Sequence, residues 1–180
     1  MDEIVRQAMA KWPQVPNAYG WLGLDARGNW YLRDAAAQAL GGFASGVPGA
    51  KGALLQHAKL IDFIQRNYEA DAVGQWFFQN GPQRVFVELE AAPWIWRVDD
   101  RGAVAAHDGR PVRVQQVLLD ELGRVFMRTD LGFGLVHTQD MGAVADAVEA
   151  GRWTPQPVQS AQLPALEGFV PSPLALRTGR

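Results

Sequence analysis

The stretch GQWFFQNGPQRVFVELE, residues 74–90, combines three consecutive aromatic side chains, an Asn-Gly turn signal and an alternating strand. Val85, Val87 and Leu89 share one face of that strand, which is the period of a sheet with one buried side. The opposite face carries Arg84, Phe86, Glu88 and Glu90. The aromatic residues therefore follow the period of a sheet, and their first expected role is to fill a core.

The same alternation continues beyond this stretch and predicts a series of short strands. They are expected at 75–79, 83–90, 94–98, about 103–107, 112–119, 124–129 and about 133–137. Asn80-Gly81 joins the first two, and because Pro82 has no N–H we expect a loop one or two residues longer than the tightest hairpin. So many strands without helices between them favour antiparallel pairing.

Helical spacing of apolar residues is found at 2–12, 53–68 and 138–151. Within 53–68, Leu54, Ile61, Ile64 and Tyr68 recur at spacings of seven, three and four, which predicts one core-facing stripe. We therefore expect an α+β fold in which antiparallel hairpins and meanders pack on this central helix, with N-terminal and C-terminal helices beside them.

The 180 residues are enough for one large domain or two small ones. We expect a body over 1–153, with a possible division into a small N-terminal lobe at 1–70 and a β-rich lobe at 71–153. Five of the eleven prolines lie between 155 and 173, which predicts an extended, non-helical tail over 154–180. Such a tail either lies over its own domain, is partly disordered, or serves as a partner-binding peptide.

An Asp-x-x-Gly pattern occurs at four places, which are 25–28, 71–74, 99–102 and 120–123. In each, Asp is suited to cap a type I turn and Gly to take a positive φ, so we expect four hairpin corners. Two of them continue alike, with Trp30 and Trp76 in the same place, which indicates a diverged internal duplication. A GTPase is disfavoured because no G-x-x-x-x-G-K-[ST] loop precedes these corners.

Trp94 and Trp96 alternate with Ile95 and Arg97 in the strand after the opening stretch. A buried aromatic ring contributes a large apolar area, so the two indoles are expected to join sheet and helix in a core. The alternative is an exposed platform on which a ligand stacks at Trp94 or Trp96.

Three histidines limit any imidazole chemistry to few positions. His57 falls on the stripe of the 53–68 helix and His107 precedes a turn, so we expect a packed ring and an exposed turn residue. His137 ends a strand just before a helix, where it suits an acid–base pair with Asp140. The alternative, which we favour, is that Thr138 or Asp140 caps the helix and His137 only ends the strand. No ligand spacing indicates a metal, and we expect no cofactor.

Two cations are candidates for holding an anionic ligand. Lys51 follows the Gly-rich segment 41–52, which serves either as an anion cradle or lid, or as a flexible connection. Arg84 is the second candidate. Glu88 and Glu90 on the same strand suit either an acid–base pair or a solvated row matched across strands by Arg97 or Arg84.

Charge and hydropathy restrict the partners. Seventeen Lys and Arg against nineteen Asp and Glu give a net charge of -2 without a basic block, which disfavours nucleic acid. No stretch approaches the roughly 20 apolar residues of a membrane span, and MDEIVRQAMAKW has no features of a secretory signal. We expect a soluble, cytoplasmic protein.

The segments LDARGNWYL, FIQRNYEADAVGQWFFQNGPQRVFVELEAAPWIWRV and GLVHTQDM together resemble an uncharacterised proteobacterial family of similar length, known only as a domain of unknown function. VELEAAPW is more distantly similar to another unannotated bacterial family with a V-E-x-x-P-F pattern. The resemblance implies a bacterial protein and no assigned activity.

We expect a non-catalytic binding or protein-interaction module, with an unknown protein or small-molecule partner and possible self-association. The alternative is an enzyme that uses His137 and Asp140 on an anionic substrate.

Overall fold

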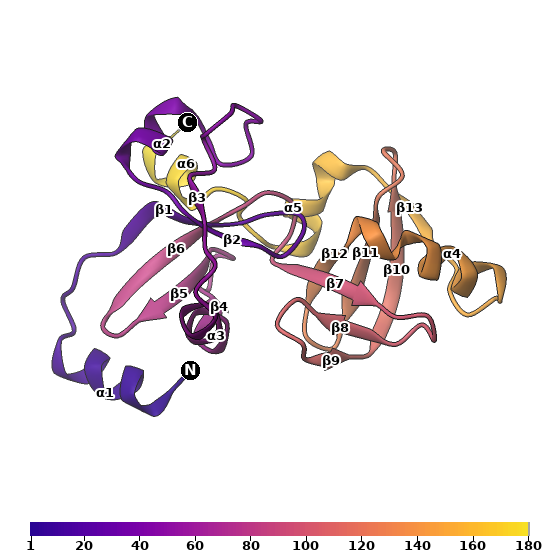
Figure 1. Ribbon diagram of the computed structural model, residues 1–180, viewed down its shortest axis with the longest axis horizontal. Helices are drawn as coiled ribbons and strands as arrows, with labels where there is room; N and C mark the ends of the chain where they lie inside the picture. The colour runs from indigo at the N-terminus through magenta and orange to yellow at the C-terminus, as the bar shows by residue number, and fades with distance from the viewer. Residues whose placement is uncertain (180) are drawn as a thin grey trace. The chain divides into compact units, whose positions relative to one another are not determined.

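The computed structural model describes residues 1–179 (Figure 1). The chain divides into two units. Unit 1 contains Met1–Asp25, Asn29–Glu90 and the C-terminal segment from Phe169, and unit 2 contains Ala26–Gly28 and Ala91–Gly168. Each unit combines helices with one mixed, mostly antiparallel sheet, so the chain has the predicted α+β class. The boundary at 90/91 differs from the lobes expected at 1–70 and 71–153.

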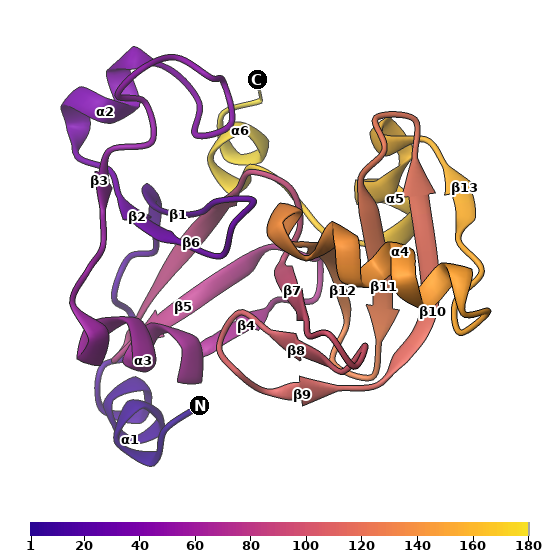
Figure 2. The same ribbon diagram turned by 45° about the vertical axis from the view of Figure 1, so that its right-hand side comes forward.

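Unit 1 is built on a six-stranded sheet with the order β3-β2-β1-β6-β5-β4 (Figure 2). Its elements are α1 (Glu3–Lys11), β1 (Ala18–Leu24), β2 (Trp30–Leu32), α2 (Ala35–Leu40), β3 (Ala53–Leu54), α3 (Ala58–Arg66), β4 (Tyr68–Ala70), β5 (Trp76–Asn80), β6 (Gln83–Leu89) and α6 (Pro173–Thr178). β1 and β6 run parallel at the centre, and the other neighbours are antiparallel. The central pairing joins β5 and β6 to the N-terminal strands, which moves the boundary of the unit past residue 70.

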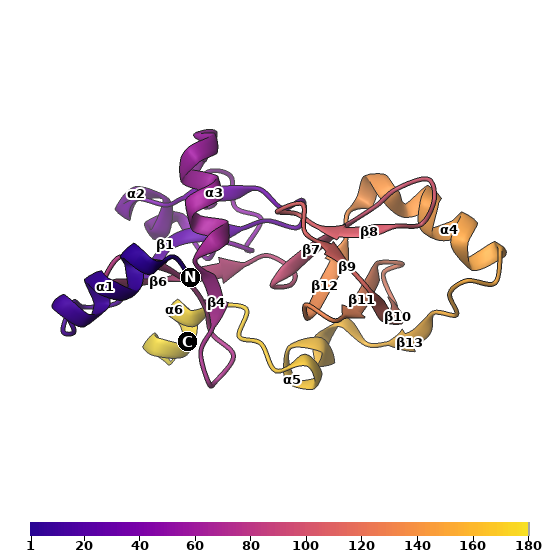
Figure 3. The same cartoon turned by 90° about the horizontal axis from the view of Figure 1, so that it is seen from below.

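The sheet of unit 1 is covered on both faces. On one face, Phe63 of α3 packs edge-to-face on Phe78, with 5.4 Å between ring centroids. On the other face, the buried Glu88 bonds to the start of α6, and Phe43 packs against Gly23. Figure 3 shows α3 and α6 on opposite sides of the strands. The opening stretch therefore has two buried faces rather than one.

Three local predictions need correction. The helix expected over 53–68 is α3, which begins only at Ala58, because residues 53–54 pair with β2 as strand β3. The tail expected to be extended over 154–180 contains the short helices α5 and α6, because proline fits the first turn of a helix. The β5–β6 hairpin has a two-residue loop, since Asn80 pairs with Gln83 and this pairing needs no N–H at position 82.

Unit 2 holds a seven-stranded sheet with the order β13-β10-β11-β12-β7-β8-β9. Its elements are β7 (Trp94–Val98), β8 (Val104–Ala106), β9 (Pro111–Val112), β10 (Val114–Asp120), β11 (Val125–Thr129), β12 (Phe133–Val136), η1 (Thr138–Asp140), α4 (Met141–Glu149), β13 (Gln156–Val158), η2 (Ser160–Gln162) and α5 (Leu163–Glu167). The strands between 94 and 136 lie close to the predicted positions, because alternation of apolar residues is a local signal.

The four Asp-x-x-Gly corners form as predicted. Asp71, Asp99 and Asp120 each accept backbone N–H groups two and four residues further on, and Asp25 accepts the one four residues on. The glycine of each corner has a φ between 77° and 86°. The side chain of Asp120 has no exposed surface and also accepts from Arg124 Nε at 2.7 Å. These bonds replace backbone partners that the turn leaves open.

Candidate functional site

Arg33, directly after β2, is the most deeply buried cation among the described residues of unit 1, with 1% of its surface exposed. Its guanidinium donates to three backbone carbonyls, those of Ala50 at 2.7 Å, Gly41 at 2.6 Å and Gly20 at 3.3 Å. Burial lowers the pKa of Arg33, and the charge of Glu88 acts in the opposite direction. Sequence analysis missed this residue, because no periodicity or motif marks it.

The carbonyls around Arg33 determine what the Gly-rich segment 41–52 does. Gly41 and Ala50, near its two ends, both direct oxygens to the guanidinium, so the loop is fixed at both ends by one side chain. A loop that presents carbonyls favours a cation and not an anion. The arrangement thus matches the connecting role considered for this segment, with a defined anchor.

Lys51, predicted as an anion ligand, is already engaged. Its Nζ lies 2.7 Å from Glu90 Oε1 and about 6 Å from the ring centroids of Tyr31 and Phe43. An anionic ligand at Lys51 would have to displace Glu90. Glu90 therefore has Lys51 as its cationic partner, where the sequence predicted Arg97 or Arg84.

Glu88 is 3% exposed and accepts hydrogen bonds from Ser172 Oγ and from the backbone N–H of Leu174 at 3.0 Å. Burial raises the pKa of Glu88 above its ordinary value, while these two bonds and the charge of Arg33 lower it. Its carboxylate is thus the anchor of α6 on the sheet. It does not form the solvated row with Glu90 that the sequence suggested.

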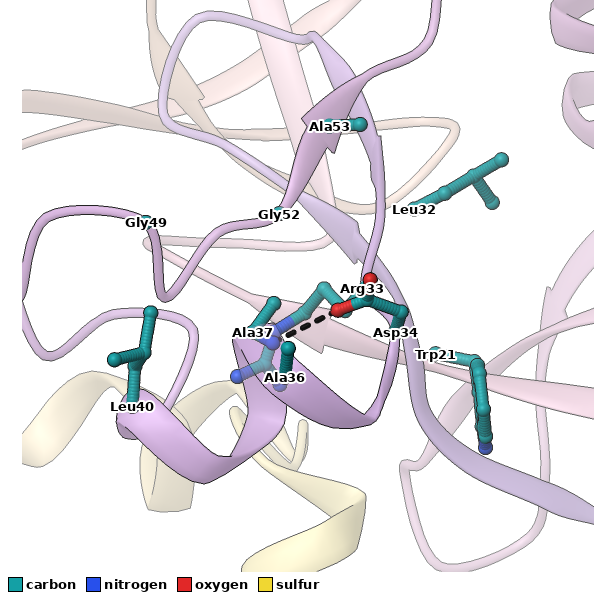
Figure 4. Close-up of a pocket in the computed structure, with 10 residues that line it drawn as sticks. All are labelled: Trp21, Leu32, Arg33, Asp34, Ala36, Ala37, Leu40, Gly49, Gly52 and Ala53. Atoms are coloured by element: carbon teal, nitrogen blue, oxygen red, sulfur yellow. Dashed lines mark hydrogen bonds between the residues drawn. The ribbon is translucent and has the colours of Figure 1, made fainter.

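An apolar groove of about 660 Å³ opens beside α2 in unit 1. Figure 4 shows its lining, with the bond between Asp34 and Ala37 at the centre, Leu40 to one side and Trp21 and Leu32 to the other. These three large apolar side chains are 53%, 48% and 45% exposed, respectively. The polar groups of the lining serve the fold, because Asp34 caps α2 and Arg33 bonds to carbonyls. The groove therefore offers apolar contact and little hydrogen bonding.

Arg84, the other predicted anion ligand, lines a second hollow of unit 1 together with Trp12 and Gln79. Its guanidinium lies 4.4 Å from the centroid of the Phe77 ring. Within residues 1–179, no carboxylate forms an ion pair with it. Arg84 is thus the predicted cation that remains open to a ligand.

His137 and Asp140, the predicted acid–base pair, are both held by structural bonds in unit 2. His137 is 4% exposed, and its Nδ1 accepts from the N–H of Gln139 at 3.1 Å, so His137 itself caps η1. Asp140 accepts from Arg97 Nε at 2.6 Å and from the N–H of Val98 at 3.0 Å. The bonds to Arg97 lower the pKa of Asp140, which favours the ionised form and makes it a weak base. The pair therefore fixes η1 to β7.

The remaining candidates also serve the fold. Trp94 and Trp96 are 2% and 0% exposed and stack with 6.2 Å between their centroids, so they belong to the core and form no exposed platform. His57 is exposed and caps α3, where the sequence predicted a packed ring. His107, predicted as an exposed turn residue, is half-buried and accepts from the N–H of Ile95. Histidine is not a preferred capping residue, so the sequence did not indicate that His57 and His137 cap helices.

The described part of the chain contains no cluster of side chains that could hold a metal ion. Among residues 1–179, no three His, Cys, Asp or Glu side chains lie together in a way that suits an ion. In the same residues, no helix is long and apolar enough to cross a membrane.

Comparisons with known proteins agree with the predicted resemblance. A family model matches residues 1–174, and its description reads "Protein of unknown function (DUF2946)". No curated protein matches the chain. Among solved structures, a DUF1285 family protein from Silicibacter pomeroyi DSS-3 matches with 10% identity and a TM-score of 0.49, covering 81% of this chain and 84% of that one.

Proposed function

Because the chain belongs to the family described as "Protein of unknown function (DUF2946)", we propose a function from the geometry of unit 1. The protein is a non-catalytic binding module, and the apolar groove beside α2 receives apolar side chains of a protein segment. The observation that carries this proposal is the gathering of the exposed Trp21, Leu32 and Leu40 around one hollow. Single exposed apolar residues are ordinary, whereas a contiguous group around a concavity is typical of an interaction site.

The chemistry of the lining supports a protein segment over a polar substrate. The carboxylate of Asp34 accepts the N–H of Ala37 at 2.8 Å, and Arg33 donates to carbonyls of its own unit. A polar ligand would find few open donors or acceptors here. An apolar side chain needs none, and it gains roughly 25 cal/mol for each Å² of apolar surface removed from water.

Selection from a displayed peptide library tests the proposal. We expect the wild-type protein to enrich peptides rich in aromatic and aliphatic residues, and Leu40→Lys to weaken their binding at least tenfold. Leu40 is the last residue of α2 and is 53% exposed, so lysine is tolerated there. Binding is measured by fluorescence anisotropy with labelled peptides.

Leu122→Lys is the matched control. Leu122 is a leucine of unit 2 with 69% exposure, and it does not line the groove. Its variant should bind the selected peptides like the wild type. Peptides that bind Leu40→Lys as tightly as the wild type would refute the groove as the site.

Self-association is one form of the same proposal, in which a second copy supplies the segment. Sedimentation velocity distinguishes it, because an oligomer that Leu40→Lys dissociates and Leu122→Lys leaves intact has its contact at the groove.

The proposal also includes the bacterial, cytoplasmic setting that the sequence resemblance implies. Immunoblotting of fractionated source cells measures that location.

A further inference from the structure

The hollow beside Arg84 has a different chemistry from the apolar groove. It has a volume of about 340 Å³ and lies between the end of α1 and the β5–β6 hairpin, all within unit 1. Trp12, Met9 and Pro13 come from the α1 side, and Gln79 and Arg84 come from the hairpin. The volume suits a small molecule.

Gln79 contributes a buried amide to this hollow. It is 1% exposed, its backbone N–H donates to Asn67 O at 2.8 Å, and its side-chain Nε2 donates to Gly81 O at 2.9 Å. Its Oε1 is buried and accepts no hydrogen bond from any residue between 1 and 179. Leaving such an oxygen without a donor costs roughly 1–3 kcal/mol, so the site favours an N–H group as a partner.

Arg84 is the cross-strand neighbour of Gln79 and lines the same hollow. The two residues are directly opposite each other in the β5–β6 register, so both side chains project from the same face of the sheet. The guanidinium carbon of Arg84 lies 4.4 Å from the centroid of the Phe77 ring, in a cation–π contact. A guanidinium suits the two oxygens of a carboxylate, which it binds through two parallel hydrogen bonds.

Two acids near Arg84 do not neutralise it by pairing. Glu69 and Asp71 line a separate hollow that Arg84 also borders. Asp71 is engaged by the N–H groups of Val73 and Gln75 in its corner, and neither acid forms an ion pair with Arg84. Within residues 1–179, Arg84 therefore has no ion-pair partner, and it lines the same hollow as Gln79.

Trp12 provides an apolar wall. Its indole is 51% exposed and has the ammonium of Lys11 4.7 Å from its ring centroid. Together with Met9 and Pro13 it forms the side of the hollow opposite the hairpin. An apolar side chain of a ligand finds contact there.

We propose that this hollow binds a molecule that carries a carboxylate, a neighbouring N–H donor and an apolar side chain, which is the chemistry of an apolar α-amino acid. Arg84 binds the carboxylate, Gln79 Oε1 accepts the N–H, and Trp12 contacts the side chain. The same chemistry is present in a free amino acid and in the C-terminal residue of a peptide. The site is independent of the apolar groove and of the function proposed for it.

Isothermal titration of the full chain with apolar amino acids tests this proposal, with leucine, methionine, phenylalanine and tryptophan as probes. We expect at least one to bind, and its carboxamide and its analogue without the amino group each to bind at least tenfold more weakly. A glycyl dipeptide ending in the same residue separates the two sources. Equal or tighter binding of the dipeptide identifies a peptide C-terminus, and preference for the amino acid identifies the free molecule.

Three variants locate the binding. Arg84→Gln and Gln79→Met should each weaken it at least tenfold, whereas Arg6→Gln, which removes an exposed arginine on α1 paired with Glu3, should leave it unchanged. Thermal melting shows that each variant is folded before titration. Absence of binding by every probe, or binding that Arg84→Gln leaves unchanged, would overturn the proposal.

Discussion

The hydroxyl of Ser172 donates a hydrogen bond to the buried carboxylate of Glu88, eighty-four residues earlier in the chain. The same hydroxyl accepts the N–H of Ala175 and so caps α6, while the N–H of Leu174 donates to Glu88. The last part of the proline-rich tail, from Phe169 on, is thereby part of unit 1. Two backbone bonds reinforce it, from Val170 to Gly74 O and from Leu89 to Pro171 O.

Ser172→Ala removes both a helix cap and a donor to a buried acid. We expect it to lower the free energy of unfolding by about 1–2 kcal/mol, measured by urea denaturation. Ser160→Ala is the control, because that hydroxyl bonds to the exposed Glu121 in unit 2 and its loss should cost less. Equal losses in the two variants would contradict the role assigned to Ser172.

The raised pKa of Glu88 should make the free energy of unfolding depend on pH. Burial raises the pKa of Glu88 above its value of 4.5 in the unfolded chain, so the folded state binds this proton more tightly. Its contribution is fully present below pH 4.5 and is lost as pH rises through the folded pKa. We therefore expect the wild type to lose stability relative to Glu88→Gln as pH increases from 4.5. Urea denaturation at several pH values measures this difference, and a difference that is constant or rises would refute it.

Arg33→Met leaves three carbonyls without their donor, including those of Gly41 and Ala50 in the Gly-rich loop. Because buried unsatisfied groups cost roughly 1–3 kcal/mol each, we expect a loss of at least about 2 kcal/mol and faster proteolysis within 41–52. Mass spectrometry of limited digests identifies the cleavage sites. Arg113→Met, at an arginine side chain that is 88% exposed, should change neither measurement. Unchanged digestion of Arg33→Met would show that the loop has another anchor.

Gly134→Ala tests the tight packing of β7 against β12 in unit 2. An added Cβ would lie 2.5 Å from Trp94 O and 2.6 Å from the Trp96 ring, so we expect a loss of about 1–3 kcal/mol, seen as a lower melting temperature. Gly142→Ala is the matched control, because it lies in α4 with open space around it. Alanine should stabilise that helix by up to about 1 kcal/mol. A neutral Gly134→Ala would mean that the indoles are loosely packed.

The strands and corners were predictable because their causes are local. Alternation placed the strand at 94–98 with its observed bounds, and Asp99 reaches N–H groups only two and four residues away. The site was much less predictable. Arg84 was identified as a candidate, but nothing in the sequence marked the buried oxygen of Gln79 as lacking a donor.

What the sequence determined by itself is the class of fold, the positions of most strands and the chemistry of the corners, since each depends on residues a few positions apart. Only the tertiary structure decided that β1 pairs with β6, that Arg33 faces carbonyls, and that Ser172 meets Glu88. These contacts join distant segments, and an alternating strand pairs equally well with many partners until the whole sheet selects one. Arg84 depended on both, because the strand pattern placed it on one face of the sheet and the tertiary structure gave it no ion-pair partner within residues 1–179.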